Sequence, residues 1–128
     1  MQTLVTRSIG LLAILLIAST AVLHAADPRK EDKAFATKLV TAVVESDYDA
    51  FVADGEAPFR QLKKEQFEAV VAQLAPKLKA GYDLLYLGEL KQQGYRVTLW
   101  KIAFKNGGDD ALATLSVKDG SVGGFWVR

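Results

Sequence analysis

The amino-acid sequence predicts an α+β domain in which three N-terminal helices pack on a curved four-stranded antiparallel meander. Two observations lead to this fold class. Residues 31–80 carry apolar side chains at helical spacing, whereas from Tyr82 onward apolar runs alternate with turns that contain glycine. Helices that precede a meander are typical of domains whose helices cover one face of the sheet.

The first 25 residues have the layout of a secretory signal peptide, with a positive start, an apolar stretch from Ile9 to Ala18 and an exit that ends at Ala25. We expect cleavage after Ala25; the next choices are Ala21 and Ala26. An uncleaved membrane anchor is the alternative, but the apolar stretch is shorter than the ~20 residues of a spanning helix. The sequence therefore predicts an exported protein, periplasmic or secreted, with residues 26–128 as one domain and no stable membrane insertion after cleavage.

Composition limits the chemistry of the exported domain. Removing 25 of the 128 residues leaves 103, and takes away Arg7 and the one histidine, His24, so that 15 basic and 15 acidic residues remain. A nucleic-acid partner is not expected, because such proteins carry a basic excess. The absence of His and Cys from residues 26–128 excludes Ser-His-Asp and Cys-His catalysis and zinc or copper sites built on imidazole or thiolate. No cofactor is expected.

The first two helices are predicted from apolar rows and capping residues. From Glu31 to Ser46, apolar residues form two adjacent rows at spacing four, which predicts an amphipathic helix; the rows are Phe35, Leu39, Val43 and Ala36, Val40, Val44. Ser46 and Asp47 supply a stop and a new N-cap, so a short helix is expected from Tyr48 to Ala53. The segment Glu56–Pro58 is expected to be a connection.

A third helix is predicted from Lys64 to Ala80. Its apolar stripe is expected to face the sheet and consists of Phe67, Val70, Val71, Leu74 and Leu78. Pro76 lacks the N–H that would bond the carbonyl of Ala72, which predicts either a kink or a break into two short helices. Gly81 is well placed to end the helix.

Four strands and their turns complete the chain. The predicted strands are Tyr82–Leu90, Tyr95–Lys105, Ala111–Val117 and Val122–Val127. In the second strand the apolar face changes between Leu99 and Trp100. Either a bulge lies there, or both faces of this strand are buried by different partners; we favour burial on both faces.

This order of elements resembles the cone-shaped fold of the nuclear transport factor 2-like (cystatin-like) superfamily, over about Phe35 to Arg128. The stretch Leu62–Phe67, the helix that runs to Gly81 and the closing Lys118–Phe125 are similar to a group of exported bacterial domains of unknown function. That group carries no catalytic signature, so the resemblance implies no catalytic residue. The superfamily does imply a cone-shaped cavity and a homodimer formed through the sheet.

Three carboxylates are the candidate catalytic residues if the protein is an enzyme, because enzymes of this superfamily place acids on the sheet or on the helices that line the cavity. They are Asp49, Asp83 and Glu89, and a carboxylate among apolar neighbours can act as a general base. Asp83 and Glu89 are expected on one strand face with Leu85 and Leu87. The favoured interpretation is that all three candidates are solvated surface residues. Asp109 and Asp110 are interpreted as a solvated loop tip, and no metal site is expected.

Four aromatic residues are the candidate ligand site: Tyr82, Tyr86, Trp100 and Trp126. They are the candidates to line a small apolar cavity, whereas core packing under the helices is the favoured interpretation of these aromatic residues. A further alternative is an outer patch of Trp100 and Trp126 that pairs two subunits. The sequence therefore favours an exported non-enzymatic binding or interaction module for a small apolar ligand or a second subunit. The alternative is an isomerase or hydratase that uses a cavity carboxylate.

Overall fold

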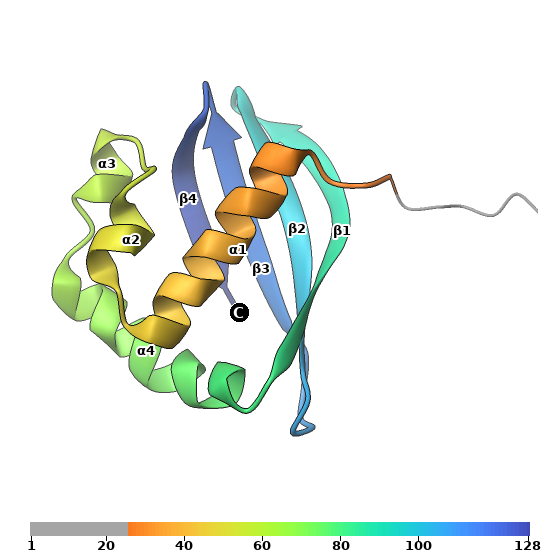
Figure 1. Cartoon of the computed structure of the whole chain (residues 1–128). Coiled ribbons are helices and arrows are strands. Elements are labelled where there is room, and N and C mark those ends of the chain that lie inside the picture. The colour runs from red at the N-terminus through yellow and green to blue at the C-terminus, as the bar shows by residue number, and fades with distance from the viewer. Residues whose placement is uncertain (1–25) are drawn as a thin grey trace, which may run out of the picture.

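A computed structural model of the chain describes residues 26–128 and confirms an α+β fold in which the helices precede the strands (Figure 1). The helices are α1 (Lys30–Glu45), α2 (Tyr48–Val52), α3 (Ala57–Arg60) and α4 (Lys64–Lys79). The strands are β1 (Tyr82–Gln92), β2 (Tyr95–Phe104), β3 (Ala111–Lys118) and β4 (Ser121–Val127). The predicted signal peptide lies outside the described residues.

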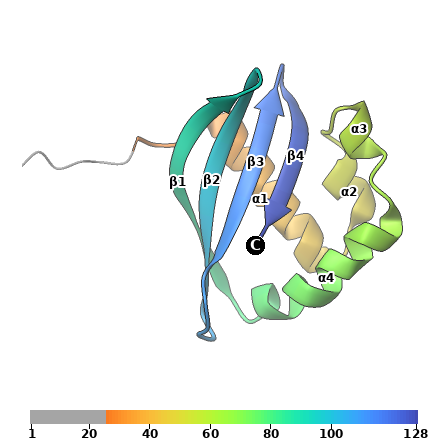
Figure 2. The same ribbon diagram turned by 180° about the vertical axis from the view of Figure 1, so that it is seen from behind.

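The four strands form one open antiparallel sheet in the order β1-β2-β3-β4. Helix α1 runs diagonally across one face, and α4 lies beyond its far end (Figure 1). From behind, no described helix covers the opposite face (Figure 2). We call the face under α1, which carries Trp100 and Ile102, the inner face, and the face that carries Leu99 the outer face.

Local chemistry explains the helix boundaries. Ser46 ends α1 in the left-handed region with φ 54°, and the Asp47 side chain accepts a hydrogen bond from the backbone N–H of Ala50 at 3.0 Å, which caps α2. The sequence did not predict α3, which covers part of the expected connection. Pro58 suits the first turn of this short helix because the missing N–H has no helical partner there.

Helix α4 is continuous through Pro76, so the predicted break into two helices is wrong. Pro76 and Ala72 are both exposed. Water can therefore satisfy the carbonyl that the proline leaves unbonded, and the helix need not end there.

Two hairpins have the turn chemistry that a two-residue connection requires. Gln93 and Gly94 have φ values of 52° and 81°, and Asp119 and Gly120 have φ values of 49° and 75°. Positive φ at both central residues is the signature of the type I′ turn, whose twist matches that of the flanking strands. These turns account for the antiparallel pairing of β1 with β2 and of β3 with β4.

The register irregularity between β1 and β2 lies on β1 and not on β2. Trp100 pairs with Tyr86 and Leu99 pairs with Gly88, so Leu87 is an extra residue in β1, whereas β2 pairs with β3 without a shift. The alternative of a bulge within β2 is therefore wrong. Val97 on the outer face and Trp100 on the inner face are both buried.

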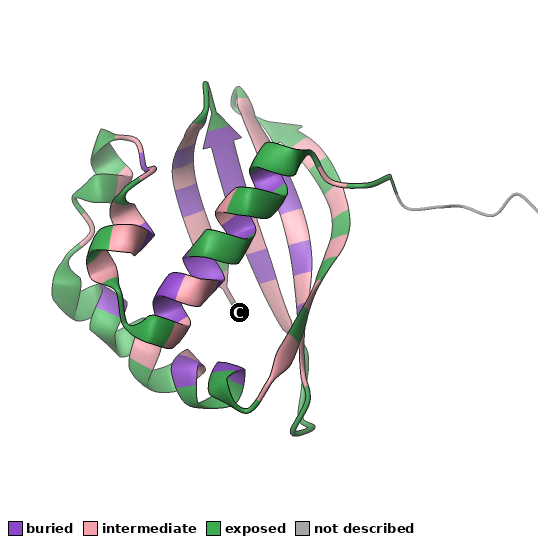
Figure 3. Cartoon of the chain, in the orientation of Figure 1, coloured by how far each residue is buried: buried purple, intermediate pink, exposed green. Residues whose placement is uncertain are grey.

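The core lies between α1 and the inner face (Figure 3). Its largest fully buried side chain is Trp100, which packs edge-on against Tyr86 with ring centroids 5.2 Å apart. The core residues of α1 that belong to the predicted rows are Ala36, Leu39, Val40 and Val43, and Ala42 contributes in addition. This single core joins the helices to the sheet.

We expect Trp100→Ala to lower the free energy of unfolding by about 3–5 kcal/mol, because it leaves a cavity in the core. Urea denaturation measures this loss. Trp126→Ala is the matched control: Trp126 is 59% exposed, so the same change is expected to cost about 1 kcal/mol or less. Equal losses for the two variants would contradict the assignment of Trp100 to the core.

Candidate functional site

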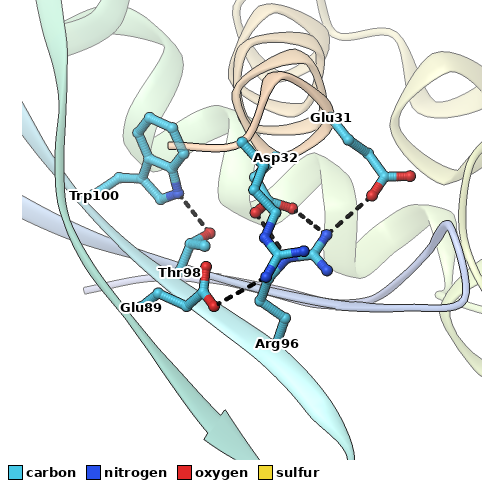
Figure 4. Close-up of polar contacts among 7 residues, drawn as sticks. Glu31, Asp32, Glu89, Arg96, Thr98 and Trp100 are labelled. Carbon is cyan, nitrogen blue, oxygen red and sulfur yellow. Dashed lines mark hydrogen bonds and ion pairs between the residues drawn. The ribbon is translucent and has the colours of Figure 1, made fainter. Parts of the chain in front are cut away.

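A buried ion pair joins α1 to β2 (Figure 4). The Asp32 carboxylate is fully buried and accepts two hydrogen bonds from the Arg96 guanidinium, from Nε at 2.8 Å and from the second terminal nitrogen at 2.7 Å. The same terminal nitrogen donates to Glu31 at 2.9 Å. These hydrogen bonds, those of Asp32 foremost, raise the pKa of Arg96 above its ordinary value, although burial acts against them. Arg96 therefore stays charged and paired.

Polar groups just before α1 and on β1 and β2 complete this cluster. Arg29 approaches Glu89 at 3.6 Å, and the Trp100 indole N–H donates to the Thr98 hydroxyl at 2.8 Å. Burial raises the pKa of the Tyr86 hydroxyl, and the negative charges of Glu89 and Asp32 raise it further. Because the cluster is internally paired and its deepest members are buried, we interpret it as a structural feature.

The four aromatic residues predicted as a ligand site do not come together. Tyr82, Tyr86 and Trp100 lie on the inner face, where they pack with the core. Trp126 pairs with Thr114, which pairs with Leu99, so Trp126 lies on the outer face. One cavity lined by all four is therefore excluded by the register, and so is an outer patch that contains both tryptophans.

The candidate carboxylates are also separated. Asp83 pairs with Ala103 and lies on the outer face, whereas Glu89 pairs with Thr98 and lies on the inner face. The expectation that Asp83 and Glu89 share a face is wrong, because the extra residue Leu87 reverses the alternation between them. Asp49 is exposed in the first turn of α2.

A groove of about 540 Å³ lies between β4 and the helices α3 and α4. We call it the β4 groove. Phe59, Phe67 and Val70 line it from the helices, and Phe125 and Val127 line it from the strand. The other lining residues are Val43, Phe51, Pro58, Gln61, Leu62, Gln66, Gly123, Gly124 and Trp126. None of these side chains is ionisable, so the groove offers apolar contact and no acid or base.

Two glycines shape the strand that borders the groove. A Cβ at Gly124 would overlap the Trp126 ring, and a Cβ at Gly123 would overlap the Tyr95 ring, so both aromatic rings lie close over the β4 backbone. The Tyr95 hydroxyl donates to Glu56 at 2.7 Å, and this hydrogen bond raises the pKa of Tyr95. Tyr95 thereby ties the start of α3 to the sheet.

Sequence reasoning missed both the ion pair and the groove. A signal for the ion pair was present, because Asp32 lies four residues before Ala36 in a buried row of α1, and Arg96 alternates with Thr98 and Trp100 on the inner face. The groove has no comparable signal, since its walls come from separate elements that only the fold brings together.

No protein-family model and no curated protein matches the chain. Over residues 26–128, none of the helices has the length and apolar character needed to cross a bilayer. The same residues contain no group of three or more carboxylates that is arranged to hold a metal ion.

We expect Arg96→Met to lower the free energy of unfolding by about 3–5 kcal/mol, because the variant leaves the Asp32 carboxylate buried without a partner. The double variant Asp32→Leu/Arg96→Met removes both charges and is expected to recover most of the loss. Urea denaturation of Arg96→Met, of Asp32→Leu and of the double variant measures the coupling free energy between the two side chains. Additive losses would contradict a buried, mutually dependent pair.

Proposed function

We propose that this chain is an exported, non-enzymatic binding module that holds apolar groups in the β4 groove. The observation that carries this proposal is the lining of the groove, which is mainly aromatic and aliphatic. Its polar side-chain groups are the amides of Gln61 and Gln66 and the indole N–H of Trp126. Concave apolar sites with a few polar groups are typical of ligand binding. The apolar ligand is thus assigned to a set of lining residues that shares only Trp126 with the site predicted from the sequence.

The alternative of an isomerase or hydratase requires a carboxylate at the bound substrate. Asp49, Asp83 and Glu89 all lie outside the lining of the β4 groove. We therefore favour binding over catalysis. Export itself rests on the predicted signal peptide, and the resemblance to the cone-shaped nuclear transport factor 2-like fold is supported by a long helix that crosses one face of an open antiparallel sheet.

The outer face of the sheet supports the proposal of a homodimer formed through the sheet. Leu85, Leu87 and Trp126 expose 44%, 51% and 59% of their surface, respectively, although each is a large apolar residue. Leu85 and Trp126 lie on the outer face, and Leu87 is the bulged residue of β1. Exposed apolar side chains on one uncovered sheet face are typical of an interface between subunits.

The groove is tested with the neutral fluorescent probe N-phenyl-1-naphthylamine. We expect the probe to bind the wild-type domain and its affinity to fall at least about tenfold in Val70→Glu, because a carboxylate in the apolar groove opposes binding by about 1.4 kcal/mol or more. Ala69→Glu is the matched control, since Ala69 is the adjacent exposed residue of α4 and does not line the groove. Absence of probe binding, or equal loss in both variants, would contradict the proposed function.

The dimer is tested by sedimentation velocity across a range of protein concentrations. We expect a dimer for the wild-type domain and a monomer for Leu87→Lys, since a charge buried in an apolar interface lacks a partner. Ala69→Lys places the same charge on α4 and is expected to leave the dimer intact. A monomeric wild-type domain would refute the homodimer and leave the groove proposal unaffected.

A further inference from the structure

The edge of β4 has backbone groups that the sheet does not use. Arg128 and Leu112 exchange both backbone hydrogen bonds, at 2.7 and 3.0 Å. Because such pairs alternate along an antiparallel ladder, the N–H and C=O groups of Phe125 and Val127 point away from β3 toward the open edge. Within residues 26–128, no hydrogen bond is formed by these four groups.

One residue outside the four strands, Gly55, pairs with β4 at this edge, but the pairing does not continue along the strand. Val122 donates its N–H to the carbonyl of Asp54 at 2.8 Å, and its carbonyl accepts from the N–H of Glu56 at 2.8 Å, which makes a parallel bridge at Gly55. The chain then turns away into α3. From Gly123 onward no described residue continues the sheet beyond β4.

The vacant part of the edge is also one wall of the β4 groove. The side chains of Phe125 and Val127 line the groove from β4, with Phe59, Phe67 and Val70 on the helices that flank it. A molecule bound in the groove therefore contacts apolar side chains. It also meets a free backbone N–H and C=O at Phe125 and again at Val127. A small apolar ligand satisfies only the first of these requirements, because it has no groups to pair with the backbone.

An extended polypeptide satisfies both requirements. Its main chain pairs with Phe125 and Val127, and every second side chain points toward the groove because side chains alternate along a strand. A second copy paired through its own β4 is a poorer fit, since each β4 is flanked by α3 and by the side chains of α4 that line the groove. Those helices would meet at the interface.

We propose that the β4 groove binds an extended segment of a partner polypeptide, which adds to the sheet as a strand beside Phe125 and Val127 and places apolar side chains at alternate positions in the groove. The paired part is about four or five residues long, or roughly 15 Å at the rise of a strand. This inference rests on the proposed function, because it names the class of partner for the same groove.

The experiment begins with peptides selected on the folded domain from a random library displayed on phage. We expect enrichment of peptides with apolar, largely β-branched residues at every second position. Binding of a selected synthetic peptide is then measured by calorimetry for the wild type, Val127→Pro and Val70→Glu. Val127→Pro removes one outward N–H and no bond to β3, and proline is tolerated at such edge positions.

Val127→Pro is expected to weaken the peptide at least about tenfold. Because Val127 also lines the groove, Val127→Ala is the matched control: it shortens the same side chain but keeps the outward N–H, and is expected to weaken the peptide less than Val127→Pro. Val70→Glu is expected to weaken both the peptide and N-phenyl-1-naphthylamine. Equal peptide affinity for the wild type and Val127→Pro would overturn strand addition. So would a library that yields no enriched peptide while the probe still binds. In both cases the apolar groove itself would stand, whereas loss of probe binding by the wild type would refute the proposed function.

A second measurement does not depend on the folding of the proline variant. Amide hydrogen exchange of the wild type is compared with and without the selected peptide. We expect exchange at Phe125 and Val127 to slow by at least about tenfold, while Trp126, whose N–H already points into the β3 ladder, changes little. Unchanged exchange at Phe125 and Val127 would contradict the proposal. Conversion of a wild-type dimer to a monomer by Val127→Pro would identify a second copy as the occupant and overturn it.

Discussion

The buried ion pair between Asp32 and Arg96 is the constraint on which the arrangement of the helices depends. It joins the first turn of α1 to the second residue of β2, across 64 positions of sequence. A fully buried carboxylate requires a charged partner with good geometry, so any arrangement that separates the two is strongly disfavoured. Apolar contacts are non-directional, whereas the paired hydrogen bonds of the ion pair require one position of α1 on the sheet.

The position of α1 in turn determines where the groove forms. At its far end, Ser46 in the left-handed conformation turns the chain into α2, which leads to the bridge between Gly55 and β4. Helices α3 and α4 follow from there and close the groove from the side opposite to β4. A polar contact at one end of the domain thus governs an apolar site at the other.

Small departures from regular strand geometry decide what each face of the sheet presents. The extra residue Leu87 in β1 moves Glu89 to the inner face beside Arg29 and leaves Asp83 on the outer face. In β4, Gly123 is the extra residue, and with Gly124 it allows two aromatic rings to lie over the strand. Both bulges therefore separate groups that strict alternation would have grouped together.

The sequence by itself determined the fold class, the single core and most element boundaries. Apolar periodicity, the Asp47 cap and the two glycine turns are local signals, and each acts through residues a few positions apart. Only the tertiary structure decided the position of α1, the face on which Glu89 and Trp126 lie, and the existence of the β4 groove. These features depend on contacts between residues that are distant in sequence and on single-residue shifts of register. Apolar periodicity reports neither, because it describes only neighbouring residues. A bulge can be recognised only when the partner strand and its register are known.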